Sequence, residues 1–204
     1  MKRVLQTAPT VEVISVTQAK EHMRVSYDYE DDDNYIDTLI KVVRETTEQF
    51  LRRKLITQTW RLYLDYWPCG DSIILPYGQL QSVTHVKYTD TNSSQSTWST
   101  DYYNADTDSD PGRVVLEYGY SWPVTTLHPQ NPIEIQYVCG YGDDSDDVPT
   151  PIIQGMLLKI SDLYEQREND VFGLSHVNLK TYEALLMPYK LWPETSDENE
   201  IWNA

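Results

Sequence analysis

Two stretches near the start of the chain repeat apolar residues with the 3.6-residue period of an α-helix. The longer stretch runs from Tyr35 to Arg53, where apolar residues form one face and charged residues occupy most other positions. The shorter helix is predicted over Thr17–Arg24, with Thr17 as the N-cap of its first turn. We expect the carboxylates of Asp31–Asp33 to stabilise the positive end of the longer helix.

From Thr57 onward the period changes to two, which is the repeat of a β-strand. Apolar and polar residues alternate as far as Tyr66, and turn-forming clusters rich in Gly, Asp, Asn and Ser separate the following runs. The further predicted strands are Ser72–Leu75, Ser82–Thr89, Arg113–Glu117 and Ile133–Cys139. Short strands with tight connections predict an antiparallel sheet.

The chain returns to a helical pattern after residue 147. Thr150 is the expected N-cap and Pro151 the expected first helical residue, because proline's missing amide costs nothing there. A last helix is predicted from about Asn178 to Leu186, ending near Met187 because Pro188 disfavours a helical conformation in the residue before it.

This order of elements predicts an α+β fold: a small bundle of about four helices with an inserted antiparallel β-sheet subdomain and a flexible C-terminal tail. Helices from both ends of the chain should pack together, since neither half can bury its apolar face alone. We expect one domain over residues 1–192, with helical parts at about 12–55 and 149–190 and the β insertion at about 56–147. Residues 193–204 are the expected flexible acidic tail.

Composition narrows the range of functions. With 16 Lys and Arg against 32 Asp and Glu, the chain carries a net charge of −16, which disfavours simple DNA binding. Its 16 Tyr and 6 Trp supply buriable aromatic area that a disordered acidic chain lacks, and that often enters interfaces. Because no apolar run reaches the roughly 18 residues of a membrane helix, we expect a soluble protein with no membrane partner, made in a cytoplasm.

Catalytic and metal-binding motifs are missing from the sequence. The four histidines lie on different predicted elements without metal-ligand spacing, and Cys69 and Cys139, both expected to be buried, form no pair or cluster. The acidic run at 143–147 lacks the glycine and the closing glutamate of a calcium loop, so we interpret it as a solvated turn. The sequence therefore predicts a protein that is not an enzyme and has no metal and no cofactor.

Several collinear segments resemble the head-to-tail connector family of tailed bacteriophages, also called adaptor or head-completion proteins. The segments are Ser15–Val25, Tyr35–Ile40, Leu55–Trp60, Leu64-Asp65, Trp67-Pro68, Asp101–Tyr103, Pro111–Arg113, Gly119–Pro123, Val138–Gly142, Val148–Ile152, Tyr164–Glu168 and Leu185–Tyr189. The resemblance covers roughly residues 12–192; the tail after Trp192 has no counterpart, and the acidity exceeds what the family leads us to expect.

The resemblance implies a structural subunit of the virion neck, assembled in the host cytoplasm. It implies a homo-oligomeric ring, expected to be a dodecamer, that lies below the portal protein and binds a downstream neck or tail protein. Double-stranded DNA would pass through its channel without specific binding. A ring subunit presents two different faces to its neighbours. The candidate interface residues are Arg44, Arg52, Arg53, Glu165, Arg167 and Glu168.

The C-terminal tail is a candidate arm for binding a partner ring, because Trp192, Ile201 and Trp202 give an acidic segment apolar anchors. An alternative function is an aromatic-rich binding module of a viral tail, for example one that binds carbohydrate. In that case Tyr118, Tyr120 and Trp122 would form a platform for stacking sugars.

Overall fold

The computed structural model describes residues 1–166 and 180–192 and divides into two compact units. Among the described residues, the helical unit comprises Thr10–Ile56 and those between Gly142 and Lys190, and the β unit comprises Met1–Pro9, Thr57–Tyr141 and Leu191-Trp192. The predicted α+β class is confirmed, and the sheet residues between Thr57 and Tyr141 separate the two halves of the helical unit along the sequence.

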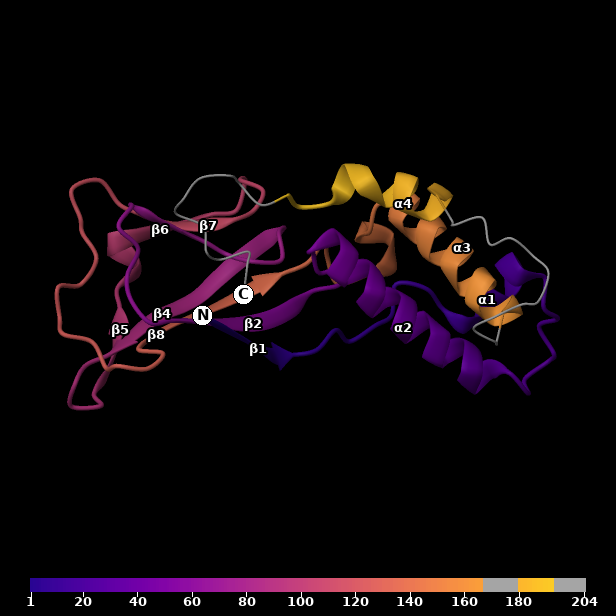
Figure 1. Ribbon diagram of the computed structural model, residues 1–204, viewed down its shortest axis with the longest axis horizontal. Helices are drawn as coiled ribbons and strands as arrows, with labels where there is room; N and C mark the ends of the chain where they lie inside the picture. The colour runs from indigo at the N-terminus through magenta and orange to yellow at the C-terminus, as the bar shows by residue number, and fades with distance from the viewer. Residues whose placement is uncertain (167–179, 193–204) are drawn as a thin grey trace. The chain divides into compact units, whose positions relative to one another are not determined.

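The helical unit is held together by α3 (Thr150–Glu165), which packs against α1 (Val16–Met23), α2 (Asp33–Leu51) and α4 (Lys180–Leu186) (Figure 1). Two 3₁₀ turns, Ser145–Asp147 and Met187–Tyr189, flank this C-terminal half. Helices from both sides of the insertion therefore share one core. Its buried apolar side chains on α2 and α3 are Ile36, Leu39, Ile40, Val43, Leu51, Ile152, Met156 and Ile160.

Helix ends differ from the predicted caps. The N-cap of α1 is Ser15 and not Thr17: the Ser15 hydroxyl accepts from the Gln18 amide at 3.2 Å, and the Gln18 side chain accepts from the Ser15 amide at 3.0 Å. This reciprocal pair is a capping box, which satisfies more of the first-turn donors than Thr17 could. The prediction for Thr150 was also wrong, because Pro149 takes the cap position and Thr150 opens α3.

The β unit contains two antiparallel sheets. The five-stranded sheet has the order β1-β2-β8-β4-β5 and the three-stranded sheet the order β3-β7-β6. A 3₁₀ turn, Thr100–Tyr102, precedes β6. The strands are β1 (Lys2–Thr7), β2 (Gln58–Leu64), β3 (Ser72–Ile74), β4 (Leu80–Thr89), β5 (Gln95–Trp98), β6 (Tyr103–Asp106), β7 (Arg113–Leu116) and β8 (Ile133–Cys139).

All the strands predicted from alternation are present, and β1, β5 and β6 were missed. β5 and β6 consist mostly of polar residues, so no run of apolar side chains marks them, unlike the comparably short β3 and β7. Their strand character comes from pairing with β4 and β7, respectively.

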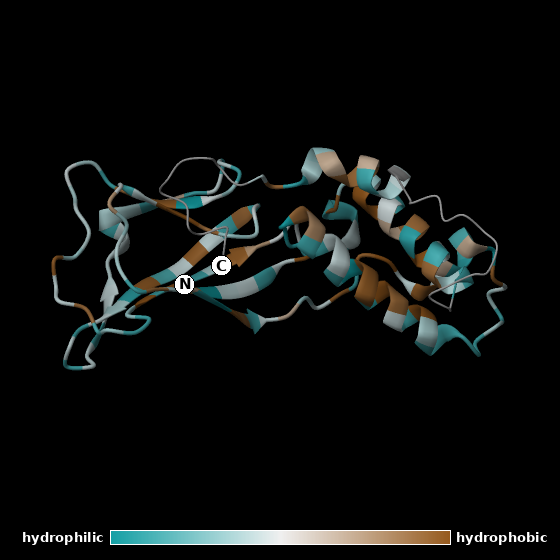
Figure 2. Ribbon diagram, viewed as in Figure 1, coloured by the Kyte–Doolittle hydropathy of each residue, from teal (hydrophilic) through white to brown (hydrophobic). Residues whose placement is uncertain are grey.

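The core of the β unit lies between its two sheets. Figure 2 shows hydrophobic residues alternating with hydrophilic ones along the strands. Trp67 and Trp122 stack with their ring centroids 5.0 Å apart, and Trp98 packs against both. Further buried members include Leu62, Ile73, Val86, Val114, Ile133, Ile135 and Tyr137. No helix within the described residues is long and apolar enough to cross a membrane.

Two glycine-to-alanine changes should have opposite effects on stability. A methyl group at Gly112 would lie 2.2 Å from Cβ of Leu80, so Gly112→Ala should lower the free energy of unfolding by about 1–3 kcal/mol through overpacking. At Gly155, inside α3, the nearest side-chain atoms lie at 3.6 Å. Gly155→Ala should therefore raise this free energy by about 0.5–1 kcal/mol. Urea unfolding followed by circular dichroism measures both, and unaltered unfolding of Gly112→Ala would contradict the packing described here.

Candidate assembly surfaces

A buried cluster of ion pairs occupies the C-terminal half of α2. Arg44 donates from Nε to Oε2 of Glu12 at 2.8 Å, and its other guanidinium nitrogens lie 3.6 Å from carboxylate oxygens of Glu45 and Glu48. Lys54 contacts the same Glu48 carboxylate at 2.8 Å. Arg44, a candidate for subunit contacts, is thus 9% exposed and paired with carboxylates of its own unit.

The other two candidate arginines end α2. Arg52 adopts a left-handed conformation with φ of 58° and closes the helix through its backbone amide, which donates to Gln49 and Glu48 carbonyls. Arg53 is 6% exposed and donates from Nε to the carbonyl of Tyr189. Arg53 therefore ties the end of α2 to the turn that follows α4, and the structure gives both arginines a role within the unit.

The remaining candidates are exposed or lie outside the described residues. Glu165 is exposed at the end of α3, and 60% of Trp192 is exposed. Arg167, Glu168, Ile201 and Trp202 lie outside the described residues. Their assignment to subunit or partner contacts stays a prediction, as does that of the three arginines.

One face of the five-stranded sheet is polar and carries a network that sequence reasoning missed. At its centre Glu134 on β8 faces His85 on β4, with Nε2 and Oε1 at 2.9 Å, and Arg61 on β2, with Nε and Oε1 at 3.6 Å. Arg61 also donates to the side chain of Gln136 at 2.8 Å. Burial alone would raise the pKa of Glu134, but hydrogen bonds from His85 and Tyr63 and the charge of Arg61 lower it.

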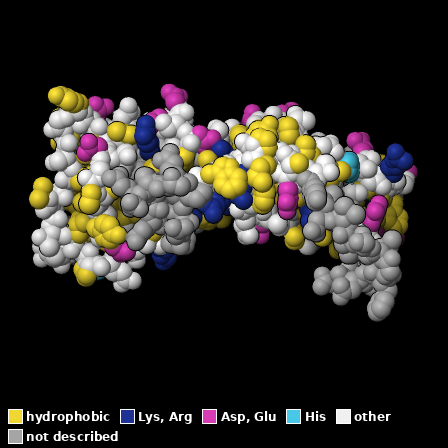
Figure 3. Space-filling view, turned by 45° about the horizontal axis from the view of Figure 1, so that its top comes forward, with side chains coloured by type: hydrophobic (Ala, Val, Ile, Leu, Met, Phe, Trp, Pro, Cys, Tyr) yellow, Lys and Arg dark blue, Asp and Glu magenta, His cyan; other side chains and the backbone are white. Residues whose placement is uncertain are grey.

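Exposed tyrosines gather at one end of the three-stranded sheet. Tyr118 is fully exposed, Tyr120 is 51% exposed, and Tyr102 packs against Tyr120 with ring centroids 4.9 Å apart. Trp122, expected as the third member of a sugar-stacking platform, instead packs on Trp67 and donates from Nε1 to the Gly70 carbonyl at 2.7 Å. Hydrophobic side chains reach the surface of both units on the face drawn in Figure 3.

Among the described residues, no group of three or more His, Cys, Asp or Glu is arranged to hold a metal ion. In the acidic turn before α3, Asp147 bends back so that its carboxylate accepts from the Asp144 amide at 3.2 Å. Cys139 is buried as expected, whereas Cys69 is exposed, which corrects the expectation for that residue.

The Glu48 cluster yields a stability prediction. Glu48→Gln should lower the free energy of unfolding by about 1–3 kcal/mol, because it removes the charge of a buried carboxylate that Arg44 and Lys54 share, while Arg44 keeps its pair with Glu12. Urea unfolding monitored by circular dichroism measures this loss. Lys41→Ala is the matched control: its pair with Asp37, at 2.7 Å, lies on the exposed side of the same helix, and its removal should change stability little. Equal effects of the two changes would contradict the buried-cluster interpretation.

Comparison with known proteins gives a match to one family model and a shared fold. The family model described as "Phage gp6-like head-tail connector protein" matches residues 13–111. No curated protein matches the sequence. The matched family is one of structural connectors and not of enzymes, as the sequence predicts for this chain.

Solved structures of a gene transfer agent (GTA) particle share the fold. A chain in the neck of the empty particle, computed with C6 symmetry, is 19% identical, with a TM-score of 0.81 over 97% of this chain and 100% of that chain. Chains in the virion of the native particle, at 19% identity, and in its neck computed with C12 symmetry, at 18%, have TM-scores of 0.78 with the same coverage. The resemblance predicted from the motifs is thereby confirmed: residues 13–111 carry the sequence signature of the phage gp6-like head-tail connector family.

Proposed function

We propose that this protein is a subunit of a ring in the neck of a tailed-phage particle, between the portal and the tail. The ring extends the DNA channel below the portal and provides the docking surface for the downstream neck or tail protein. The match of residues 13–111 to the head-tail connector family is the observation that carries this proposal.

The fold and the charge are consistent with this role. The fold is shared with GTA chains over 97% of this chain, so the helical and β units both have counterparts there. A net charge of −16 on each copy would give the channel of such a ring a negative field. Phosphates would then pass the wall without binding to it, as DNA passage requires.

The proposal predicts a ring in complex with the portal. Electron microscopy of the protein mixed with the portal of its own phage should show a rotationally symmetric ring below the portal, with a dodecamer as the expected stoichiometry. The portal without this protein is the control. A complex without rotational symmetry, or a position away from the neck, would reject the proposal.

The tail from residue 193 to residue 204 is proposed as an arm that binds a partner ring. Its removal should abolish joining of tails to filled heads, measured as infectious assembly, while circular dichroism and urea unfolding of the protein stay unchanged. A second variant, with Ile201 and Trp202 both replaced by Ser, keeps the acidic residues and separates apolar anchoring from charge. Normal infectious assembly after the truncation would discard the arm.

A further inference from the structure

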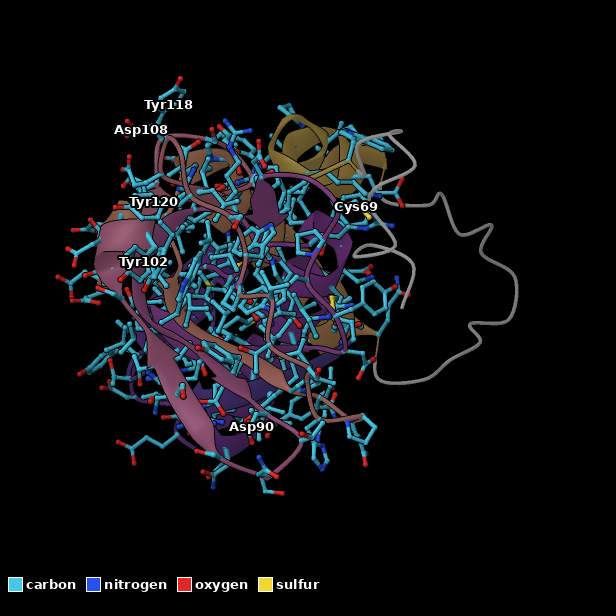
Figure 4. The ribbon with its side chains drawn as sticks, turned by 90° about the vertical axis from the view of Figure 1, so that its left-hand side faces the viewer. Cys69, Asp90, Tyr102, Asp108, Tyr118 and Tyr120 are labelled. Atoms are coloured by element: carbon cyan, nitrogen blue, oxygen red, sulfur yellow. The ribbon has the colours of Figure 1, made fainter. Side chains whose placement is uncertain are left out.

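The β unit carries an acidic edge built on tyrosines. It lies at the end of the three-stranded sheet where Tyr103 pairs with Leu116. Figure 4 shows Tyr118, Tyr120 and Tyr102 along one side of this unit. We define the acidic edge by these tyrosines and the exposed carboxylates next to them: Tyr102, Tyr118, Tyr120, Asp71, Asp101 and Glu117.

Two tyrosines of the acidic edge, Tyr102 and Tyr120, are held in place by packing. The Tyr102 ring packs against two other rings, those of Trp98, with centroids 6.1 Å apart, and of Tyr120. The Glu117 amide donates to the Tyr102 carbonyl at 3.0 Å, and the Tyr120 amide donates to the Glu117 carbonyl at 3.0 Å. Rigid tyrosines lose little conformational entropy on binding, which is why they are enriched in interface hot spots.

No described cation neutralises the acidic edge. The three-stranded sheet has Arg113 on β7, but Arg113 pairs with Asp106 at the opposite end of the β6–β7 hairpin, at 2.8 Å. Asp108, which Figure 4 draws near Tyr118, belongs to the turn at that opposite end. The edge is therefore negative as well as aromatic.

A second surface of the β unit has the opposite charge. Directly paired residues of antiparallel strands point to the same side of a sheet. Lys2 pairs with Tyr63, Tyr63 with Glu134, and Glu134 with Lys87, so these side chains form one row across β1, β2, β8 and β4. The next row holds Arg61, Gln136 and His85. We call this surface the basic face.

The basic face stands out because the chain is so acidic. Glu134 is the single carboxylate in these two rows, and Arg61 and His85 already contact it. Lys2 and Lys87 add positive charge that no described carboxylate contacts within ion-pair distance. The other described acids of the β unit lie in its loops or at strand ends; one of them, Asp65 after β2, lies 3.9 Å from the Met1 amine.

We propose that the acidic edge of one copy of this chain binds the basic face of the next copy. The proposal rests on the ring proposed above, because a ring needs two different, complementary surfaces on every subunit. The two surfaces have opposite charge, belong to the same unit and are formed by different sheets. The exposed tyrosines supply the apolar contact, and Lys2 and Lys87 meet the carboxylates.

A second copy fits the basic face better than DNA does. Duplex binding gains its affinity from several cations that displace counterions, and here Glu134 offsets part of a small cationic set. The rest of the chain is strongly acidic and would repel phosphates. An acidic protein surface with aromatic side chains suits both the charge and the Tyr63 ring of this face.

Charge reversal tests the pairing. Lys2→Glu/Lys87→Glu makes the basic face acidic and leaves the Arg61–Glu134–His85 network in place, and Asp101→Lys/Glu117→Lys makes the acidic edge basic. Each variant alone should associate with itself about tenfold or more weakly than wild type in sedimentation velocity, and fewer rings should form on the portal. A mixture of the two variants, and a single chain with all four changes, should recover association.

Controls separate local charge from net charge. Two control variants carry their changes on the helical unit. Lys41→Glu/Lys159→Glu changes the net charge as much as Lys2→Glu/Lys87→Glu does, and Glu30→Lys/Asp31→Lys as much as Asp101→Lys/Glu117→Lys does. Both controls should associate about as strongly as wild type. Circular dichroism checks that each variant is folded. Failure of the mixture and of the fourfold variant to recover association would overturn the proposal.

Two other outcomes have distinct meanings. If Lys2→Glu/Lys87→Glu weakens binding to a short DNA duplex but leaves association unchanged, the basic face is a DNA surface and the proposal falls. If both charge-reversal variants form rings on the portal as readily as the wild type does, the ring function stands and this interface is wrong. If the wild type forms no rings on the portal, the ring function is rejected. Self-association of the wild type in sedimentation velocity, its loss in each variant and its recovery in the mixture then still decide the pairing.

Discussion

The helical unit depends on burial of apolar side chains from two segments that the β residues separate in sequence. On α2, Ile36 and Ile40 are buried in the core to which α3 contributes Met156 and Ile160. Each of these helices alone would expose its apolar face to water, so neither is stable without the other. The polar contacts depend on this core. The Glu48 cluster and the hydrogen bond from Arg53 to Tyr189 hold neighbouring segments against helices that are already packed.

Hydrophobic period was sufficient to predict most elements, because it reports directly which positions face a core. It did not predict features that depend on side-chain hydrogen bonds at a helix end or on pairing between strands. Ser15 and Gln18 form a capping box that the sequence already contained, yet Thr17 is also a favoured N-cap residue and lies closer to the apolar face. β5 and β6 become strands because neighbouring strands supply hydrogen-bond partners, which no window of four residues reveals.

Assembly surfaces were harder to predict than the fold. Charged helix residues were natural candidates, but Arg44 and Arg53 are turned inward and satisfied within their own unit. The basic face was hidden because its members are far apart in sequence. Lys2 and Lys87 become neighbours only through the register of β1, β2, β8 and β4. Alternation shows that one side of a strand is polar, whereas the charge of the whole face depends on which strands lie side by side.

The interleaving of the two units along the chain affects how the protein is made on the ribosome. The five-stranded sheet lacks its middle strand until β8 is translated, and the helical unit lacks α3 until still later. Both units thus require contacts between distant residues, which slows folding relative to local structure. Neither unit can fold completely until nearly the whole polypeptide has emerged from the ribosome. A subunit therefore cannot form its folded binding surfaces for other copies during synthesis.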